Sequence, residues 1–397
     1  MPRGGRARRA KPEESLIPKD SVQLPQELID GIIDEFDVSL TDVKDTGIFP
    51  DRNTLRSCAL VCRAFARPSQ KKLFSIVSTQ SAGWNQPPDE RLRLFSKFLA
   101  SNPHIGQYVR TLNLGYRCAR SKSLDYILVS LPNLRTLSLY PWKDLYGRNS
   151  DAFEELPIHH RDAFLAAFSL SSLRSLSLRN HLFSNALELQ SMLINSVGLE
   201  ELVLQSIKWA DLSVVGSPKG RPHSPRLVLK SLKLVGMSIS DIDALLNAFT
   251  AVDIRHLQSL CCDRYHHSLF QAASTIRDLS LIADTPNFTI FYPEQRDLIS
   301  PSSLQSLSLN VDNLAIVLSL INRLGTLKAA PILKRISVSV SYWIVAGFWP
   351  LIEPMLLEAS SVEDICLKLN PSAGTEAMVR ASLPTINAKG ILKISFM

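Results

Sequence analysis

The chain has 397 residues, of which 45% are hydrophobic and 20% are charged. This composition excludes an intrinsically disordered protein, and the length allows more than one hydrophobic core. The formal net charge is +7, and residues 1–20 contribute +3 of it through six basic and three acidic residues. The rest of the chain is therefore only mildly basic.

Residues 1–20 are predicted to form a disordered basic leader, and the alternative is a nuclear-import signal or a weak nucleic-acid contact. The segment has no apolar run of the kind found in secretory signals. The most hydrophobic later run, residues 341–358, is interrupted by Pro350, Glu353 and Pro354, so it does not suit a membrane span. We expect a soluble protein of the cytoplasm or nucleus.

A helical module is predicted between Leu24 and Phe74. Pro25 suits the first position of a helix, and Glu27 then falls in the first turn, where a negative charge is favourable. A second helix is expected with Asp51 or Asn53 as its cap. Both helices carry apolar side chains at spacings of three and four: Leu28, Ile29, Ile32, Ile33 and Phe36 on the first, and Leu55, Cys58, Ala59, Cys62 and Phe65 on the second.

Helices this short cannot bury all of these side chains among themselves. We therefore expect a partner or a following domain to cover part of the apolar surface. The alternative is an ordinary helical cap of a larger domain, in which the same side chains simply form core.

A repeated motif, L-x-x-L-x-L, follows this module. Its clearest copies begin at Leu134, Leu173, Leu199, Leu229 and Leu304. The fourth positions of all copies, weaker ones included, are residues 112, 137, 176, 202, 232, 260, 279, 307, 336, 365 and 394. Ten intervals span 282 residues, a mean of 28.2, which lies within the range of leucine-rich repeats.

Each unit reads as a strand followed by a helix. The apolar positions alternate with polar ones, as a strand with one buried face requires, and Ser184 and Ser240 are candidate caps of two following helices. Single units of this kind have no core, but stacked units bury a continuous one. The sequence thus predicts an α/β solenoid with a curved parallel sheet on its inner side.

The side chains between the leucines should line that inner face. They mix both charge signs with many serines, whereas a nucleic-acid groove is basic throughout and carries stacking aromatics, so we expect a protein ligand. The loop at residues 216–226, rich in Pro, Gly and basic residues, is a second candidate for contact with an acidic or phosphorylated partner. The candidates on the inner face are Tyr140, Arg179, Gln205, Lys233, Asn310 and Arg335.

Catalytic and metal-binding motifs are missing, so we expect neither an enzyme nor a cofactor. Cys261 and Cys262 stand near His266 and His267, but adjacent residues on a strand point to opposite faces and do not readily share an ion. The six cysteines lack a spaced framework, and we interpret them as reduced, mostly buried thiols.

The segment LPQEL at Leu24, followed by LVCR at Leu60 and then by the repeats, resembles an F-box protein with divergent leucine-rich repeats, as in the fungal F-box-like family. This resemblance implies a helical module (residues 21–80) that docks on the Skp adaptor of a cullin-RING ubiquitin ligase. It also implies a solenoid of about eleven units (residues 81–397) that binds a protein substrate. The positions matching the docking pattern are Leu24, Pro25, Leu28, Ile29, Ile32 and Val61.

The chain departs from the family pattern in three places. A hydrophilic stretch, residues 38–50, separates the first two helices, and Phe65 stands where Trp is common. Most units also lack the Asn that follows the strand in typical repeats, with His181 and Ile207 at that position in two of them. The turns must then be satisfied in another way. An interaction scaffold without a role in ubiquitination remains the alternative function.

Overall fold

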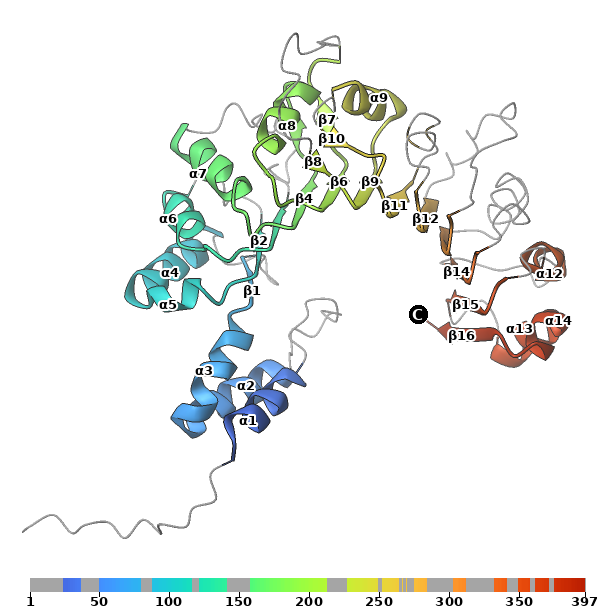
Figure 1. The fold of residues 1–397 in the computed structure, drawn as a ribbon, viewed down its shortest axis with the longest axis horizontal. Helices are drawn as coiled ribbons and strands as arrows, with labels where there is room; N and C mark the ends of the chain where they lie inside the picture. The colour runs from blue at the N-terminus through green and yellow to red at the C-terminus, as the bar shows by residue number, and fades with distance from the viewer. Residues whose placement is uncertain are drawn as a thin grey trace, which may run out of the picture. The chain divides into compact units, whose positions relative to one another are not determined.

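The computed structural model describes residues 24–36, 50–79, 88–115, 121–140, 158–212, 227–248, 252–263, 266, 269, 275–283, 303–311, 332–340, 349–357, 361–370 and 375–396. They form two compact units that divide between Leu73 and Phe74 (Figure 1). The basic leader and the loop at residues 216–226 lie outside the described residues.

The first unit contains helices α1 (Gln26–Asp34), α2 (Pro50–Val61) and α3 (Arg63–Leu73). Its buried apolar side chains include Ile29, Ile33 and Leu55. Pro25 lies one residue before α1 begins, and its carbonyl accepts the first helical N–H groups, so the prediction that it occupies the first helical position was wrong by one residue. Asp51 and Asn53 fall inside α2 and do not cap it, because Pro50 already opens that helix.

A proline inside α3 determines how α1 is attached. Pro68 has no N–H to donate to the carbonyl of Ala64, four residues earlier. The Nε2 atom of Gln26 donates to that carbonyl instead, at 3.2 Å. At the other end of α1, Lys72 Nζ donates to the carbonyl of Asp34 at 3.1 Å. Helix α1 is thus held against α3 at both of its ends.

The second unit is built on one parallel sheet. Among the described residues this sheet has twelve strands in the order β1-β2-β3-β4-β6-β9-β11-β12-β13-β14-β15-β16, and every neighbouring pair is parallel. The strands are β1 (Ile76–Ser78), β2 (Thr111–Leu114), β3 (Thr136–Leu139), β4 (Ser175–Arg179), β6 (Glu201–Gln205), β9 (Ser231–Val235), β11 (Ser259–Cys262), β12 (Asp278–Ala283), β13 (Ser306–Val311), β14 (Arg335–Val340), β15 (Asp364–Leu369) and β16 (Leu392–Phe396).

Helices cover the outer side of this sheet, and the strands line its inner side (Figure 1). Two short parallel pairs, β5 (Leu182–Phe183) with β7 (Lys208–Trp209) and β8 (Leu227–Val228) with β10 (Val252–Asp253), extend individual units. The architecture is an α/β solenoid with an all-parallel sheet, as the repeat pattern predicts. The helices described in this unit are α4 (Pro88–Ser101), α5 (Pro103–Gly106), α6 (Ser123–Val129), α7 (Ile158–Phe168), α8 (Ala186–Leu193), α9 (Ile239–Ala248), α12 (Trp349–Leu357), α13 (Glu376–Ser382) and α14 (Pro384–Ala388).

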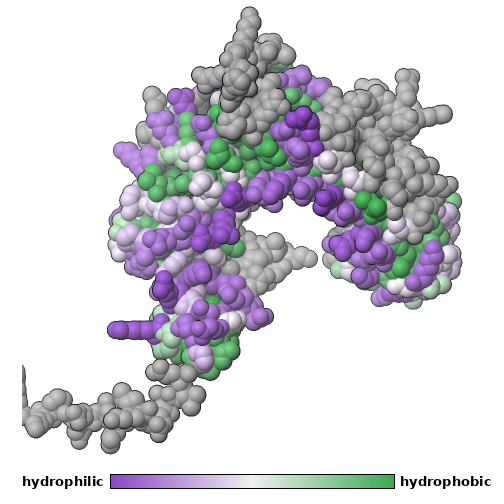
Figure 2. All heavy atoms as spheres, viewed as in Figure 1, coloured by the Kyte–Doolittle hydropathy of each residue, from purple (hydrophilic) through white to green (hydrophobic). Residues whose placement is uncertain are grey.

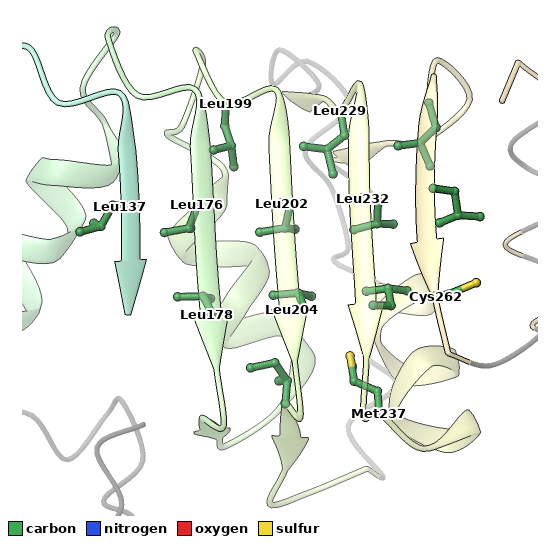
Figure 3. Packing of buried hydrophobic residues seen from close by; sticks show 14 of the residues in the cluster. Leu137, Leu176, Leu178, Leu199, Leu202, Leu204, Leu229, Leu232, Met237 and Cys262 are labelled. Atoms are coloured by element: carbon green, nitrogen blue, oxygen red, sulfur yellow. The ribbon is translucent and has the colours of Figure 1, made fainter. Parts of the chain in front are cut away.

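The repeated leucines form continuous rows in the core. Leu176, Leu202 and Leu232 pair in register across β4, β6 and β9, and all three are buried (Figure 3). The same row extends from Leu112 to Ile365 without a slip. Each fully buried leucine contributes roughly 2 kcal/mol by removal of apolar surface from water.

The two ends of the sheet differ from the expected pattern. The residue of β16 that pairs with Ile365 is Leu392, so the choice of residue 394 as the last fourth position was wrong by two. Strand β1 has no copy of the repeat motif and lies within the range expected for the helical module. It nevertheless pairs with β2, since Val77 lies opposite Leu112.

Backbone and hydroxyl hydrogen bonds connect the units on the side where the strands begin. The carbonyl of the residue before a strand accepts two amides from the next unit, as Arg174 does from Glu200 (2.8 Å) and Glu201 (2.9 Å). In four units a hydroxyl two residues earlier donates to a carbonyl of the preceding unit: Ser172 to Leu134, Thr275 to Leu257, Ser303 to Ile276 and Ser361 to Leu333.

The turns after β4, β6 and β9 share one conformation. Asn180 (φ 52°), Ser206 (φ 53°) and Gly236 (φ 69°) all adopt positive φ, a conformation that reverses the chain direction locally. The following residue is buried in each case, and after β4 it is His181, whose Nε2 lies 3.2 Å from the carbonyl oxygen of Leu139. This histidine thus makes the inter-unit contact for which typical repeats use Asn.

Two helix caps differ from the residues predicted. Helix α8 is capped by Asn185, whose Oδ1 accepts from Glu188 N at 3.1 Å, and not by Ser184. Helix α9 begins at Ile239, so Ser240 lies inside it and Ser238 caps it, accepting from Asp241 N at 3.1 Å. None of the described helices combines the length and apolarity that crossing a membrane requires.

Candidate partner-binding surfaces

The first unit exposes large apolar side chains that its own core does not use. Leu60 is 86% exposed, Val61 69% and Leu28 55%, and Leu24 and Ile32 are also exposed. We call these five residues the apolar patch. Figure 2 shows hydrophobic residues gathered at the bottom of this unit as it is drawn. Patches of this kind mark sites for partners more often than isolated exposed leucines do.

The patch is assembled from two helices by contacts already described. The bond from Gln26 to Ala64 places the start of α1 beside the junction of α2 and α3. Leu60 and Val61 end α2 at that junction. Leu24 and Leu28, which flank Gln26 in sequence, therefore lie near them. Both helices thus carry exposed apolar side chains near this junction.

Five of the six residues expected to contact the adaptor are exposed: Leu24, Pro25, Leu28, Ile32 and Val61. Ile29 is the exception, because it is only 3% exposed and packs inside the unit. Ile29 is therefore a core residue of the unit and not one of its exposed docking residues. Leu60 was missed, although it is the most exposed of the group. The signal was present, since Leu60 and Leu55 differ by five positions and so lie on different sides of a helix.

The inner face of the sheet carries the polar side chains that the alternation predicted. Figure 2 shows a hydrophilic band along it. Ser138 and Ser177 are buried within this face, whereas Glu201 and Lys368 are exposed. The chemistry is mixed, and no described strand carries a row of stacking aromatics toward the inner side. This surface suits a polar protein ligand better than a nucleic acid.

The six candidate residues on this face fall into two separate groups. Tyr140, Arg179, Gln205 and Lys233 occupy the consecutive strands β3, β4, β6 and β9 or their ends, and Gln205 lies directly opposite Arg179. Asn310 and Arg335 occupy β13 and β14, beyond two intervening strands. A single small ligand does not span both groups.

The two groups differ in how their arginines are paired. In the first, the Cζ atom of Arg179 lies 4.8 Å from the centre of the Tyr140 ring, a cation–π contact. In the second, Arg335 Nε lies 3.4 Å from Asp364 Oδ2, and Lys393 Nζ lies 3.1 Å from the other oxygen of that carboxylate. Arg335 therefore already has a carboxylate partner within its own sheet, which it shares with Lys393.

The cysteines and histidines that the structure describes do not gather into a metal centre. Cys262 is buried on the core side of β11 while Cys261 lies on the inner face, so the two side chains point apart as expected. His266 Nε2 contacts Asp243 Oδ1 at 2.7 Å. Within the described residues, no group of three or more His, Cys, Asp or Glu side chains is placed to hold an ion.

The described thiols differ in burial, and a shifted pKa bears on the reactivity of Cys261. Burial raises the pKa of the Cys261 thiol, which lowers its share of reactive thiolate, although nearby Lys233 acts in the opposite direction. The prediction of mostly buried thiols was wrong for Cys62, which is exposed. Cys58, Cys261 and Cys366 are half-buried.

No protein-family model matches the chain, and a search of curated proteins finds no match either. The functional argument therefore depends on the residues and surfaces described above.

Proposed function

We propose that this protein is the substrate-recognition subunit of a cullin-RING ubiquitin ligase, with the first unit docking on the Skp adaptor and the solenoid binding a protein substrate. The observation that carries the proposal is the apolar patch: five exposed apolar side chains on a small helical unit. The resemblance of the segments LPQEL and LVCR to an F-box names the partner that such a patch would take.

The physical argument is one of unburied surface. Leaving these side chains in water costs roughly 25 cal/mol for each Å² of apolar area, which a partner recovers on binding. Association itself costs several kcal/mol, so a stable complex requires most of the patch to be covered at once. The patch offers five exposed apolar side chains from one small helical unit, which a single partner could cover together.

The second unit supports the assignment of a receptor role. A solenoid presents an extended face made of many short strands, a form used widely for binding other proteins. The inner face of this one is polar and chemically varied. A chain with one apolar docking surface and one polar recognition surface suits a bridging subunit without catalytic groups of its own.

The direct test is co-expression of the full chain with the Skp adaptor, followed by pull-down. We expect a stable complex with the wild-type chain and about 100-fold weaker binding for Pro25→Asp combined with Leu28→Asp. That loss corresponds to about 3 kcal/mol, the value of two apolar contacts replaced by buried charge. Both residues are exposed, so the double variant should keep the fold of the helical unit, which circular dichroism would report.

A second pair of substitutions and a matched control make the result specific. Leu60→Asp with Val61→Asp alters the other helix of the patch and should weaken binding similarly. Val129→Asp alters an apolar residue of the solenoid that is 73% exposed and should leave adaptor binding unchanged. Failure of the wild-type chain to bind, or binding unaffected by either pair of substitutions in the helical unit, would refute the proposal.

An interaction scaffold remains the second candidate, because the same two surfaces serve it equally well. Ubiquitination separates the two functions. With a reconstituted ligase, a receptor should direct ubiquitin chains to proteins held on the solenoid. A scaffold should hold the adaptor and the same proteins without chain formation.

A further inference from the structure

Arg179 occupies an unusual position on the inner face of the solenoid. It ends β4, and its neighbours on the adjacent strands are Tyr140, at the end of β3, and Gln205, which pairs with it on β6. The guanidinium lies over the Tyr140 ring at 4.8 Å. An aromatic surface beneath a guanidinium restricts its motion while leaving the hydrogen-bonding edge of the plane free for other contacts.

Hydrogen-bonding capacity is left unused at this point of the sheet. The Nε of Arg179 is buried and has no hydrogen-bond partner among the described residues. The hydroxyl of Ser177, two residues earlier on the same strand and facing the same side, has none either. Buried polar atoms without partners cost free energy, and two of them close together on one face indicate a contact that the described residues do not supply.

No carboxylate of the described strands is placed to neutralise Arg179. Glu201 lies opposite Ser175, four residues before Arg179, or about 13 Å along the strand. Asp263 follows β11, three strands away or roughly 14 Å, and its Oδ2 accepts from Gly236 N at 2.5 Å. Arg335, on the same face, lies beside Asp364. The unneutralised arginine is thus a local feature of β4 and not a general property of the sheet.

Lys233 adds a second positive charge at a distance that suits an extended peptide. It lies on β9, two strands from β4, and pairs with Val203, one inward-facing position before Gln205. The separation from Arg179 is about 12 Å, the length of three to four residues of extended chain. One ligand segment can therefore reach both cations with two of its side chains.

We propose that Arg179, set on Tyr140 and flanked by Ser177 and Gln205, is the anchor for an anionic side chain of an extended segment of a protein partner. The anion is a carboxylate or a phosphate, since both match the planar fork of a guanidinium through two parallel hydrogen bonds. Lys233 binds a second acidic group of the same segment. This inference rests on the proposed function, because it names the chemical class of substrate that the solenoid recognises.

The test uses the full chain and three fluorescent pools of short degenerate peptides, measured by fluorescence anisotropy. One pool is rich in Glu, one carries phosphoserine at the same positions, and one carries Gln. The wild-type chain should bind one or both acidic pools at least tenfold more tightly than the Gln pool, and the preferred pool identifies the anion. Arg179→Gln should lose about tenfold of that affinity, as for a charge-assisted bidentate contact.

Further variants separate an anchor from a structural residue. Arg179→Lys keeps the charge but not the fork and should also weaken binding severalfold. Tyr140→Phe should bind like wild type, whereas Tyr140→Leu should lose about threefold because the aromatic surface is gone. Arg335→Gln is the matched control: it removes an equal charge from the same face and should leave the affinity unchanged. Thermal unfolding of each variant confirms that the fold is kept.

Four results would overturn the inference. Three of them are equal affinity of wild type for the Glu, phosphoserine and Gln pools, no effect of Arg179→Gln, and equal effects of Arg179→Gln and Arg335→Gln. Single-stranded DNA bound as tightly as the acidic peptides, with the same dependence on Arg179, would also overturn it by showing a general polyanion site. Adaptor binding is measured separately, so a chain that binds the adaptor but no acidic peptide refutes only this inference.

Discussion

At the scale of single residues, His181 shows how this solenoid replaces the missing Asn of its turns. The imidazole is buried after β4, and its Nε2 lies 3.2 Å from the carbonyl of Leu139 in the preceding unit. Burial lowers the pKa of His181 from 6.5 to about 4, with the hydrogen bond to that carbonyl opposing the effect. The native protein therefore holds a neutral histidine at neutral pH.

This histidine makes stability depend on pH. Between pH 6.5 and about 4 the unfolded chain binds a proton at this residue and the native chain does not. The stabilisation is thus fully present above pH 6.5 and is lost as the pH falls toward 4. His181→Asn should keep the contact with Leu139 and flatten the loss of stability over this range, measured by chemical denaturation at several pH values.

The control is His104→Asn, which removes an exposed histidine of α5. It should leave the pH dependence as in wild type. A wild-type slope retained in the His181 variant would assign the pH dependence to other groups.

The helical unit shows which properties of a residue can be predicted from sequence. The spacing of Leu28, Ile29, Ile32 and Ile33 correctly indicates one helix with a broad apolar surface. It does not indicate which part of that surface faces outward. The position of α3 decides this, by covering Ile29 and Ile33 and leaving Leu28 and Ile32 exposed.

At the scale of elements, strands followed the sequence pattern more closely than helix ends did. A strand with one buried face shows apolar and polar residues in alternation within its own sequence, so the apolar rows of the sheet could be predicted from the sequence. The predicted helix starts were wrong by one or two residues because several residues able to cap a helix lie close together in sequence. Examples are Ser184 with Asn185, and Ser238 with Ser240. The residue that distinguishes the true cap is an acidic residue three positions later. It is Glu188 for Asn185 and Asp241 for Ser238.

Helix α9 allows this reading to be tested. Ser238 and Asp241 cap the helix reciprocally, since Ser238 N also donates to Asp241 Oδ2 at 3.2 Å. Ser238→Ala should lower the free energy of unfolding by about 1 kcal/mol. Ser240→Ala, at the second residue of the helix, should change the free energy of unfolding by less than about 0.5 kcal/mol. Equal effects in urea denaturation would contradict the assignment of Ser238 as the cap.

At the scale of the whole solenoid, stability comes from contacts between neighbouring units. Each unit has a row of leucines and a carbonyl that accepts two amides from the next unit, and neither has a partner in an isolated unit. Such a stack behaves as a chain of nearest-neighbour contacts. A defect in the middle therefore disturbs two contacts, and a defect at an end disturbs one.

Replacing Leu232 and replacing Ile394 by Ala should therefore lower the free energy of unfolding by different amounts. Leu232 is fully buried between Leu202 and Leu260, and its replacement by Ala should cost about 2–5 kcal/mol. Ile394 is half-buried on the last strand, beside Leu367 alone among its described strand partners, and its replacement should cost less than about 1.5 kcal/mol. Urea denaturation measures both, and a larger loss for Ile394 would contradict the nearest-neighbour description.

The solenoid architecture was predictable because its period recurs along most of the chain, so errors in single units did not matter. The first and last strands were predicted least well. Strand β1 carries no leucine motif, and Leu392 rather than Ile394 meets the row. End units have one neighbour instead of two, so their sequences are held less strictly to the shared pattern. The pairing of Arg335 and the lack of it at Arg179 depend on neighbouring strands and have no signature in either strand alone.

Pro68 has a consequence for how the apolar patch can be studied. The proline withholds one donor from α3, and the side chain that replaces this donor is Gln26, which lies 38 positions from Ala64, the residue whose carbonyl it contacts. The orientation of α1 thus depends on a backbone N–H that is missing from α3, a helix distant in sequence. A peptide of residues 24–36 would carry most of the same apolar side chains but would form no such surface, because the geometry resides in the assembled three-helix unit and not in the recognisable motif.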